Sequence, residues 1–129
     1  MPGRILVIDD EPQITRVLRA SLSAQGFDVR TANDPEEGLL LFRDWSPDLV
    51  VTDLMMPGMN GAELIHRLTK THPQLPVIVA SGAIDVIAEL MGQDSFNALG
   101  IRATLMKPFK LADLVGKTKE LILLAEQVS

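Results

Sequence analysis

Five short aliphatic runs, separated by longer segments with helical spacing, constrain the fold of this sequence more than any other feature. The runs span residues 4–8, 28–32, 49–53, 77–80 and 103–106. Several of them are continuously apolar and do not alternate with polar residues. That pattern is typical of strands that are covered on both faces in a parallel sheet. We therefore expect five buried strands.

The segments between these runs carry apolar residues at helical spacing, and residues that favour helix termini lie at their ends. Pro12 and Pro35 suit the first helical position, Asp34 suits a cap, and Gly26 suits the end of the first helix. Helices are expected over residues 12–25, from 34–35 through 42, over 62–71, within 84–99 and over 111–126. Repeated strand–helix units with right-handed crossovers predict a doubly wound α/β fold with helices on both faces of a parallel sheet.

Composition limits the remaining classes. A chain of 129 residues that is 47% hydrophobic suits one domain, residues 1–129. The net charge of −5 and the lack of a basic block argue against direct nucleic-acid binding. The absence of cysteine excludes disulfides and thiolate metal sites. No apolar stretch is long enough for a membrane span and no signal peptide is visible, so we expect a cytoplasmic protein.

Polar residues follow the aliphatic runs at the edge of the sheet where doubly wound folds bind ligands. They are Asp9 and Asp10 after the first run, Asp53 at the end of the third, Ser81 after the fourth and Lys107 after the fifth. Three converging carboxylates suggest a hard divalent cation such as Mg²⁺. A lysine and a hydroxyl beside them suit a phosphoryl group.

Asp53 is the best candidate for a nucleophile that accepts a phosphoryl group. It precedes LMMPGMNG, a loop whose proline and glycines allow the backbone to bend close to a ligand. Each residue of this set has a commonplace interpretation as a turn, a cap or a surface charge. Their occurrence at successive strand ends in one topology favours the functional interpretation.

Four segments together resemble the receiver domain of two-component response regulators, and the resemblance covers essentially the whole chain. The segments are ILVIDDEP, LVVTDLMMPGMNG, PVIVASG and LMKPF. The resemblance implies a flavodoxin-like fold, a three-layer αβα sandwich with the strand order 2-1-3-4-5. It also implies a signalling domain that is not an enzyme in its own right.

The resemblance further implies that Asp53 accepts a phosphoryl group from a phosphohistidine of a histidine kinase or a histidine phosphotransfer protein. It assigns Asp10 and Asp53 as direct Mg²⁺ ligands, Asp9 as a ligand mainly through water, and the backbone carbonyl of Met55 as a further ligand. It also assigns Ser81 to a phosphoryl oxygen, Lys107 to the phosphoryl charge, and a cis bond to Lys107–Pro108. Glu11 has no role in this set, and we interpret it as an acid of the first helical turn.

Two departures from the family pattern fall on the face that commonly carries output. Thr104 stands three residues before the lysine, where the family usually has an aromatic ring that swings inward. The segment from Ser81 to Lys107 is longer than usual, and Gly92 is among the residues that interrupt its helical pattern. We therefore expect a shortened, displaced or mobile fourth helix.

Other functions remain open at this point. A metal-dependent aspartyl phosphatase usually needs a second acid two residues beyond its nucleophile, where this chain has Met55. A flavin-binding domain fits poorly because DDEP would repel a phosphate. A receiver-like binding module that works without phosphate is the third alternative. Output through a downstream protein or a fused output domain, and homodimerisation, are all compatible with the sequence.

Overall fold

The computed structural model describes residues 3–128 and contains, in that range, five strands and six helices. The strands are β1 (Arg4–Ile8), β2 (Asp28–Ala32), β3 (Leu49–Thr52), β4 (Val77–Ser81) and β5 (Ala103–Met106). The helices are α1 (Pro12–Ser23), α2 (Pro35–Trp45), α3 (Gly61–Thr71), α4 (Ile84–Met91), α5 (Gln93–Asn97) and α6 (Leu111–Val128).

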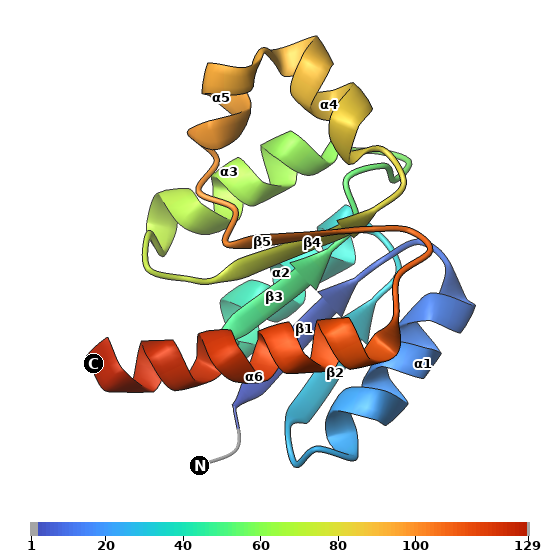
Figure 1. The fold of residues 1–129 in the computed structure, drawn as a ribbon, viewed down its shortest axis with the longest axis vertical. Coiled ribbons are helices and arrows are strands. Elements are labelled where there is room, and N and C mark those ends of the chain that lie inside the picture. Colours follow the sequence, from blue (N-terminus) through green and yellow to red (C-terminus); the bar gives the residue numbers. More distant parts are fainter. Residues whose placement is uncertain (1–2, 129) are drawn as a thin grey trace.

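The five strands form one parallel sheet in the order β2-β1-β3-β4-β5, which confirms the expected topology (Figure 1). Ile5 of β1 lies opposite Val29 of β2 on one side and Leu49 of β3 on the other. β3 ends at Thr52, one residue earlier than predicted. β4 continues one residue further than predicted, to Ser81.

Helices cover both faces of the sheet, so the molecule is the three-layer αβα sandwich that the sequence predicts. Alternate strand residues point to opposite faces. Leu6 and Ile8 join a core with α2 and α3, whereas Ile5 and Val7 join a core with α1 and α6. Figure 1 shows α6 lying across the front of the sheet next to α1. Burial on both faces explains why the strand sequences are continuously apolar.

Side chains cap two of the helices. Asp34 accepts a hydrogen bond from the Glu37 N–H at 2.8 Å at the start of α2, and Asn60 accepts one from the Glu63 N–H at 2.8 Å at the start of α3. The residue before α1 is Glu11, whose side chain makes no capping hydrogen bond. The Asn60 cap fixes the beginning of α3 at the end of the loop that follows Asp53.

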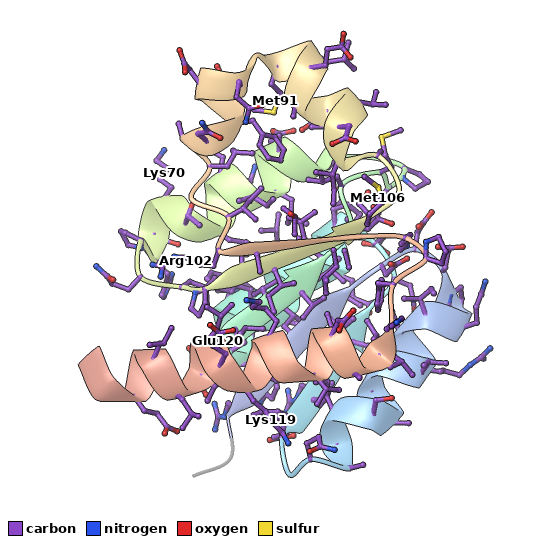
Figure 2. The ribbon with its side chains drawn as sticks, in the orientation of Figure 1. Lys70, Met91, Arg102, Met106, Lys119 and Glu120 are labelled. Carbon is purple, nitrogen blue, oxygen red and sulfur yellow. The ribbon has the colours of Figure 1, made fainter. Side chains whose placement is uncertain are left out.

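The expected interruption of the fourth helix is confirmed. Gly92, with a φ of 88°, separates α4 from the short α5. Phe96 of α5 is buried against the core, and Met91, labelled in Figure 2, packs against it where the two helices meet. Leu90 of α4 is 77% exposed. Phe96 and Met91 thus help to anchor the hairpin formed by α4 and α5 to the core.

β5 is an edge strand, and Figure 2 labels its last residue, Met106, and Arg102, which directly precedes the strand. Ala103 and Leu105 pack towards the α1 and α6 side, while Thr104 and Met106 are exposed. Thr104 therefore lies at the surface. No helix within residues 3–128 combines the length and apolar character needed to cross a membrane.

Near the amino-terminal ends of the strands, two arginines lie close to the only tryptophan of the chain. The guanidinium carbons of Arg4 and Arg30 lie 5.7 and 4.8 Å from the ring centroid of Trp45. Arg4 also donates a hydrogen bond to the Trp45 carbonyl at 2.7 Å. These cation–π contacts and the burial of the ring make Trp45 a packing residue.

A close backbone approach at Gly61 holds the loop after Asp53 in place. The Gly61 N–H donates to the Leu54 carbonyl at 2.9 Å. A Cβ on Gly61 would lie 2.4 Å from the Leu54 Cα, closer than atoms can approach. Only glycine allows α3 to begin directly against the residue that follows Asp53.

We expect Gly61→Ala to lower the free energy of unfolding by about 1–3 kcal/mol, because the added methyl group must displace backbone. Gly116→Ala is the matched control, since Gly116 lies in α6 with nothing within 4 Å of its added Cβ. That change should stabilise the protein by about 0.5–1 kcal/mol through helix propensity. Urea unfolding measures both, and equal effects of the two changes would contradict the close approach.

Candidate functional site

Asp53 follows β3 directly, and the backbone of the next two residues orients its carboxylate. Oδ1 accepts hydrogen bonds from the Leu54 N–H at 2.6 Å and the Met55 N–H at 3.0 Å. The Asp53 N–H still bonds the Ile8 carbonyl at 3.1 Å, so the residue remains tied to β1. The side chain is buried and its second oxygen, Oδ2, faces Lys107.

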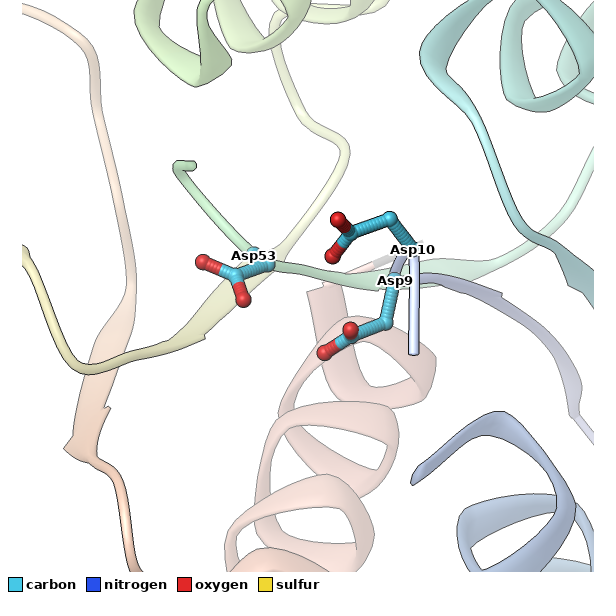
Figure 3. A group of neighbouring side chains, drawn as sticks. All are labelled: Asp9, Asp10 and Asp53. Atoms are coloured by element: carbon cyan, nitrogen blue, oxygen red, sulfur yellow. The ribbon is translucent and has the colours of Figure 1, made fainter. Parts of the chain in front are cut away.

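Asp9 and Asp10 follow β1, on the strand next to β3, and Figure 3 shows them beside Asp53. Asp9 is buried, and its Oδ1 accepts the Glu11 N–H at 3.0 Å. Carboxylate oxygens from Asp9, Asp10 and Asp53 all lie within 4.8 Å of one another. The predicted convergence of the three acids is therefore present in the structure.

Lys107 occupies the centre of the cluster. Its Nζ donates to Asp53 Oδ2 at 2.7 Å, to Asp9 Oδ2 at 2.8 Å and to Glu11 Oε2 at 2.9 Å. An ammonium group has three N–H donors, so every donor of Lys107 is engaged. The bond that follows, Lys107–Pro108, is cis, as expected.

Ser81 lies beneath this cluster at the end of β4 and is fully buried. Its carbonyl accepts the Lys107 N–H at 3.0 Å, and its Oγ accepts the Ala83 N–H at 3.1 Å. The Ser81 side chain is also close enough to the Asp53 carboxylate to help lower its pKa. The structure therefore brings together all five predicted side chains, Asp9, Asp10, Asp53, Ser81 and Lys107.

Electrostatics keep the central groups charged. Burial alone would raise the pKa of Asp53, but hydrogen bonds from Lys107, Ser81 and Met55 lower it below its ordinary value. Burial would lower the pKa of Lys107, but its hydrogen bonds to Asp53, Asp9 and Glu11 raise it above its ordinary value. At neutral pH, Asp53 is an ionised carboxylate and Lys107 an ammonium.

Asp9 behaves differently from Asp53. Burial raises the pKa of Asp9 above its ordinary value, although the hydrogen bond from Lys107 and the N–H of Glu11 oppose that rise. Its carboxylate therefore depends on the ammonium more than that of Asp53 does, because Asp53 also has two backbone N–H donors.

Sequence reasoning missed two residues that shape the site. Glu11 is more than a helix acid, because its carboxylate pairs with Lys107. Asn33, at the end of β2, donates from Nδ2 to the Asp9 carbonyl at 2.9 Å and to Thr15 Oγ1 at 3.2 Å. The acids at this edge of the sheet outnumber the lysines, and this excess was a signal that Glu11 could pair with Lys107. No local pattern pointed to Asn33, because its contacts depend on the pairing of β1 with β2.

The donor set fits a small, hard divalent cation. Such ions take oxygen ligands and often bind through one or two carboxylates while keeping several waters. The four carboxylates of Asp9, Asp10, Glu11 and Asp53 outnumber the one ammonium, so the cluster stays anionic. Among the ion pairs of the described residues, none involves Asp10.

Comparison with known proteins agrees with this geometry. The family model of the response regulator receiver domain matches residues 5–119. The chain belongs to this family. The receiver domain is thus shown by the match, by the sheet order and by the acidic pocket with its lysine.

Among similar proteins, response regulator MprA of Mycolicibacterium vanbaalenii is 38% identical over 122 residues, which are 95% of this chain and 51% of the relative. DNA-binding response regulator MtrA of Mycolicibacterium smegmatis is 34% identical over 119 residues, 92% of this chain and 50% of the relative. This receiver domain therefore spans about half the length of these curated relatives.

A solved structure shows the same fold along the whole chain. It is the CheY-like response regulator receiver domain protein from Methanospirillum hungatei JF-1, with a TM-score of 0.90 and 29% identity over 100% of both chains.

We expect Mg²⁺ to raise the thermal stability of the wild type and to do much less for Asp10→Ala. A ligand at a hundred times its Kd stabilises a fold by about 2.7 kcal/mol. Asp10 is the acid of the cluster whose negative charge is not offset by an ion pair with Lys107. Differential scanning calorimetry with and without Mg²⁺ measures the shift. Asp85→Asn, which neutralises an exposed acid of α4, is the control. Equal gains in Asp10→Ala and wild type would contradict a metal site at Asp10.

We also expect Lys107→Met to lower the free energy of unfolding in metal-free buffer by about 3 kcal/mol at neutral pH, because buried Asp9 and Asp53 lose their counterion. Burial already raises the pKa of Asp9 above its ordinary value, and loss of the opposing hydrogen bond from Lys107 raises that pKa further. Such a group opposes folding at higher pH, and the penalty falls as pH drops through the folded pKa.

The deficit relative to wild type should therefore be smaller near pH 5 than near pH 7 by urea unfolding at each pH. Lys117→Met is the control, because Lys117 pairs with Glu120 at the surface and should lose less than about 0.5 kcal/mol. A deficit that is the same at both pH values would exclude this account.

Proposed function

We propose that this receiver domain accepts a phosphoryl group on Asp53 from a phosphohistidine of a histidine kinase or a histidine phosphotransfer protein. The observation that carries the proposal is the Asp53 carboxylate itself. It is ionised, held by the N–H groups of Leu54 and Met55, and placed beside an acidic pair and a lysine.

In this reaction an Asp53 oxygen forms a bond to phosphorus while the phosphorus–nitrogen bond to the donor histidine breaks. The products are an aspartyl phosphate and a free imidazole on the donor. Transfer needs mainly positioning and neutralisation of charge on the phosphoryl oxygens. Bound Mg²⁺ would supply part of that neutralisation.

We assign the roles as follows. Asp10 and Asp53 would hold Mg²⁺ directly, Asp9 mainly through water, and the Met55 backbone carbonyl would add a ligand. Ser81 would donate to one phosphoryl oxygen, and Lys107 would turn its ammonium to another. The proximity of these groups to the Asp53 carboxylate supports the assignment.

Receiver domains are signalling modules, and we propose that this one acts in the cytoplasm through altered contacts with other proteins. MtrA is named as a DNA-binding regulator. The net charge of −5 makes direct DNA contact by this domain unfavourable. Output would therefore pass to a fused output domain or a downstream protein, and homodimerisation stays a prediction.

The readout of phosphorylation would differ from the family's usual one. Thr104 is exposed and carries no ring that could swing inward. The broken α4–α5 hairpin lies in the segment between Ser81 and β5.

The two alternatives have less support. At the position where a phosphatase would have a second acid, the Met55 side chain is 57% exposed and offers no proton donor. A phosphate-independent binding module would have no need for the complete set of acids, hydroxyl and lysine.

We expect acetyl phosphate with Mg²⁺ to add one phosphoryl group to the wild type and none to Asp53→Asn, because the amide is a poor nucleophile. Intact-mass spectrometry measures the adduct, and hydroxylamine should remove it, as expected of an acyl phosphate. Asp48→Asn is the matched control. Asp48 accepts the Arg4 N–H at the far edge of the sheet and should not affect labelling. Equal labelling of wild type and Asp53→Asn would refute the assignment.

A further inference from the structure

Glu11 stands apart from the other two carboxylates that contact Lys107. Asp9 and Asp53 are 4% and 8% exposed, whereas the Glu11 side chain is 47% exposed. Asp9 and Asp53 also belong to the group of acids that could hold a cation, and Glu11 does not. Glu11 therefore contacts the lysine without being part of the metal site.

Hydrogen bonds fix the backbone of Glu11, whereas its side chain takes no part in capping α1. Its N–H donates to Asp9 Oδ1, and its carbonyl accepts the Ile14 N–H at 3.0 Å and the Thr15 N–H at 3.2 Å. The side chain makes no capping hydrogen bond at the start of α1, where an acid could make one. Instead it reaches Lys107 at 2.9 Å.

All three donors of Lys107 are occupied, so the ammonium must give up a partner to bind a phosphoryl oxygen. A cation at the metal site would attract the carboxylate oxygens of Asp9 and Asp53. Their hydrogen bonds with Lys107 would then be weaker. The ion pair between Glu11 and Lys107 would not be weakened in this way, because Glu11 is not among the acids that could hold the cation. In the metal-loaded site, Glu11 is thus the anion that still competes for Lys107.

We propose that Glu11 is a positioning residue that competes with the incoming phosphoryl group for Lys107 and so limits how readily the site takes that group up. This inference rests on the proposed function of Asp53. It assigns to Glu11 a regulatory effect on phosphoryl affinity that is separate from metal binding. A shift of the exposed Glu11 side chain frees one of the three donors of Lys107.

Beryllofluoride in the presence of saturating Mg²⁺ tests the inference, because it mimics a phosphoryl group on an aspartate without a chemical step. The Kd is measured by isothermal titration calorimetry for wild type, Glu11→Gln and Glu11→Asp. Loss of one partly exposed ion pair should tighten binding by about two-fold to five-fold in Glu11→Gln.

Glu11→Asp separates competition from simple charge repulsion. Aspartate keeps the negative charge but is one methylene shorter, and at this position it favours capping α1 over reaching Lys107. Competition predicts tighter binding in both variants. Repulsion through space predicts tighter binding in Glu11→Gln alone, and that result would overturn the inference.

Two further controls complete the experiment. Asp85→Asn removes an exposed negative charge at the start of α4, outside the ion pairs of Lys107, and should leave the Kd unchanged. Titration with Mg²⁺ alone should show no gain in affinity in Glu11→Gln. A tightening of Mg²⁺ binding that accounts for the change in beryllofluoride affinity would also overturn the inference.

The outcomes distinguish the inference from the function on which it rests. If the wild type binds beryllofluoride and neither Glu11 variant binds it more tightly, Glu11 is no competitor and the proposed function stands. If the wild type binds none, while calorimetry shows that it is folded and binds Mg²⁺, the phosphoacceptor function fails and the inference fails with it.

Discussion

The rest of the site depends on the placement of one ammonium group among carboxylates. Lys107 reaches Asp9 and Asp53 from positions 98 and 54 residues away in the sequence. Without a cation at this point, like charges at the ends of β1 and β3 would repel one another in a buried space. The same lysine is the group that a phosphoryl anion would need, so one side chain serves the resting fold and the proposed chemistry.

The sheet makes this placement accurate. Two hydrophobic cores, one on each face, fix the register of β1 and β3, and the Lys107 N–H bonds the Ser81 carbonyl at the ends of β5 and β4. Four strand ends therefore supply the site with little freedom in their relative positions. The loop after Asp53 is closed by Gly61 and Asn60, which keeps the two N–H donors on its carboxylate.

The sequence predicted the strands, the helices and the five converging side chains, because aliphatic runs and strand-end polar residues are local patterns. The strand order came from the resemblance to receiver domains. The partners of Asn33 could not be predicted, since its contacts depend on the pairing of β1 with β2, which no local pattern states. Gly92 indicated an interrupted fourth helix, but the anchoring of α5 by Phe96 depends on packing against the distant core.

The position of Trp45 decides what tryptophan fluorescence can detect in this protein. The single tryptophan is held between Arg4 and Arg30 at the amino-terminal edge of the sheet, while Asp9 and Asp53 lie beyond the carboxyl-terminal edge. Its emission is therefore remote from the chemistry at Asp53 and reports mainly on global unfolding. A change in that emission on phosphorylation would mean that a rearrangement crosses the full length of the strands.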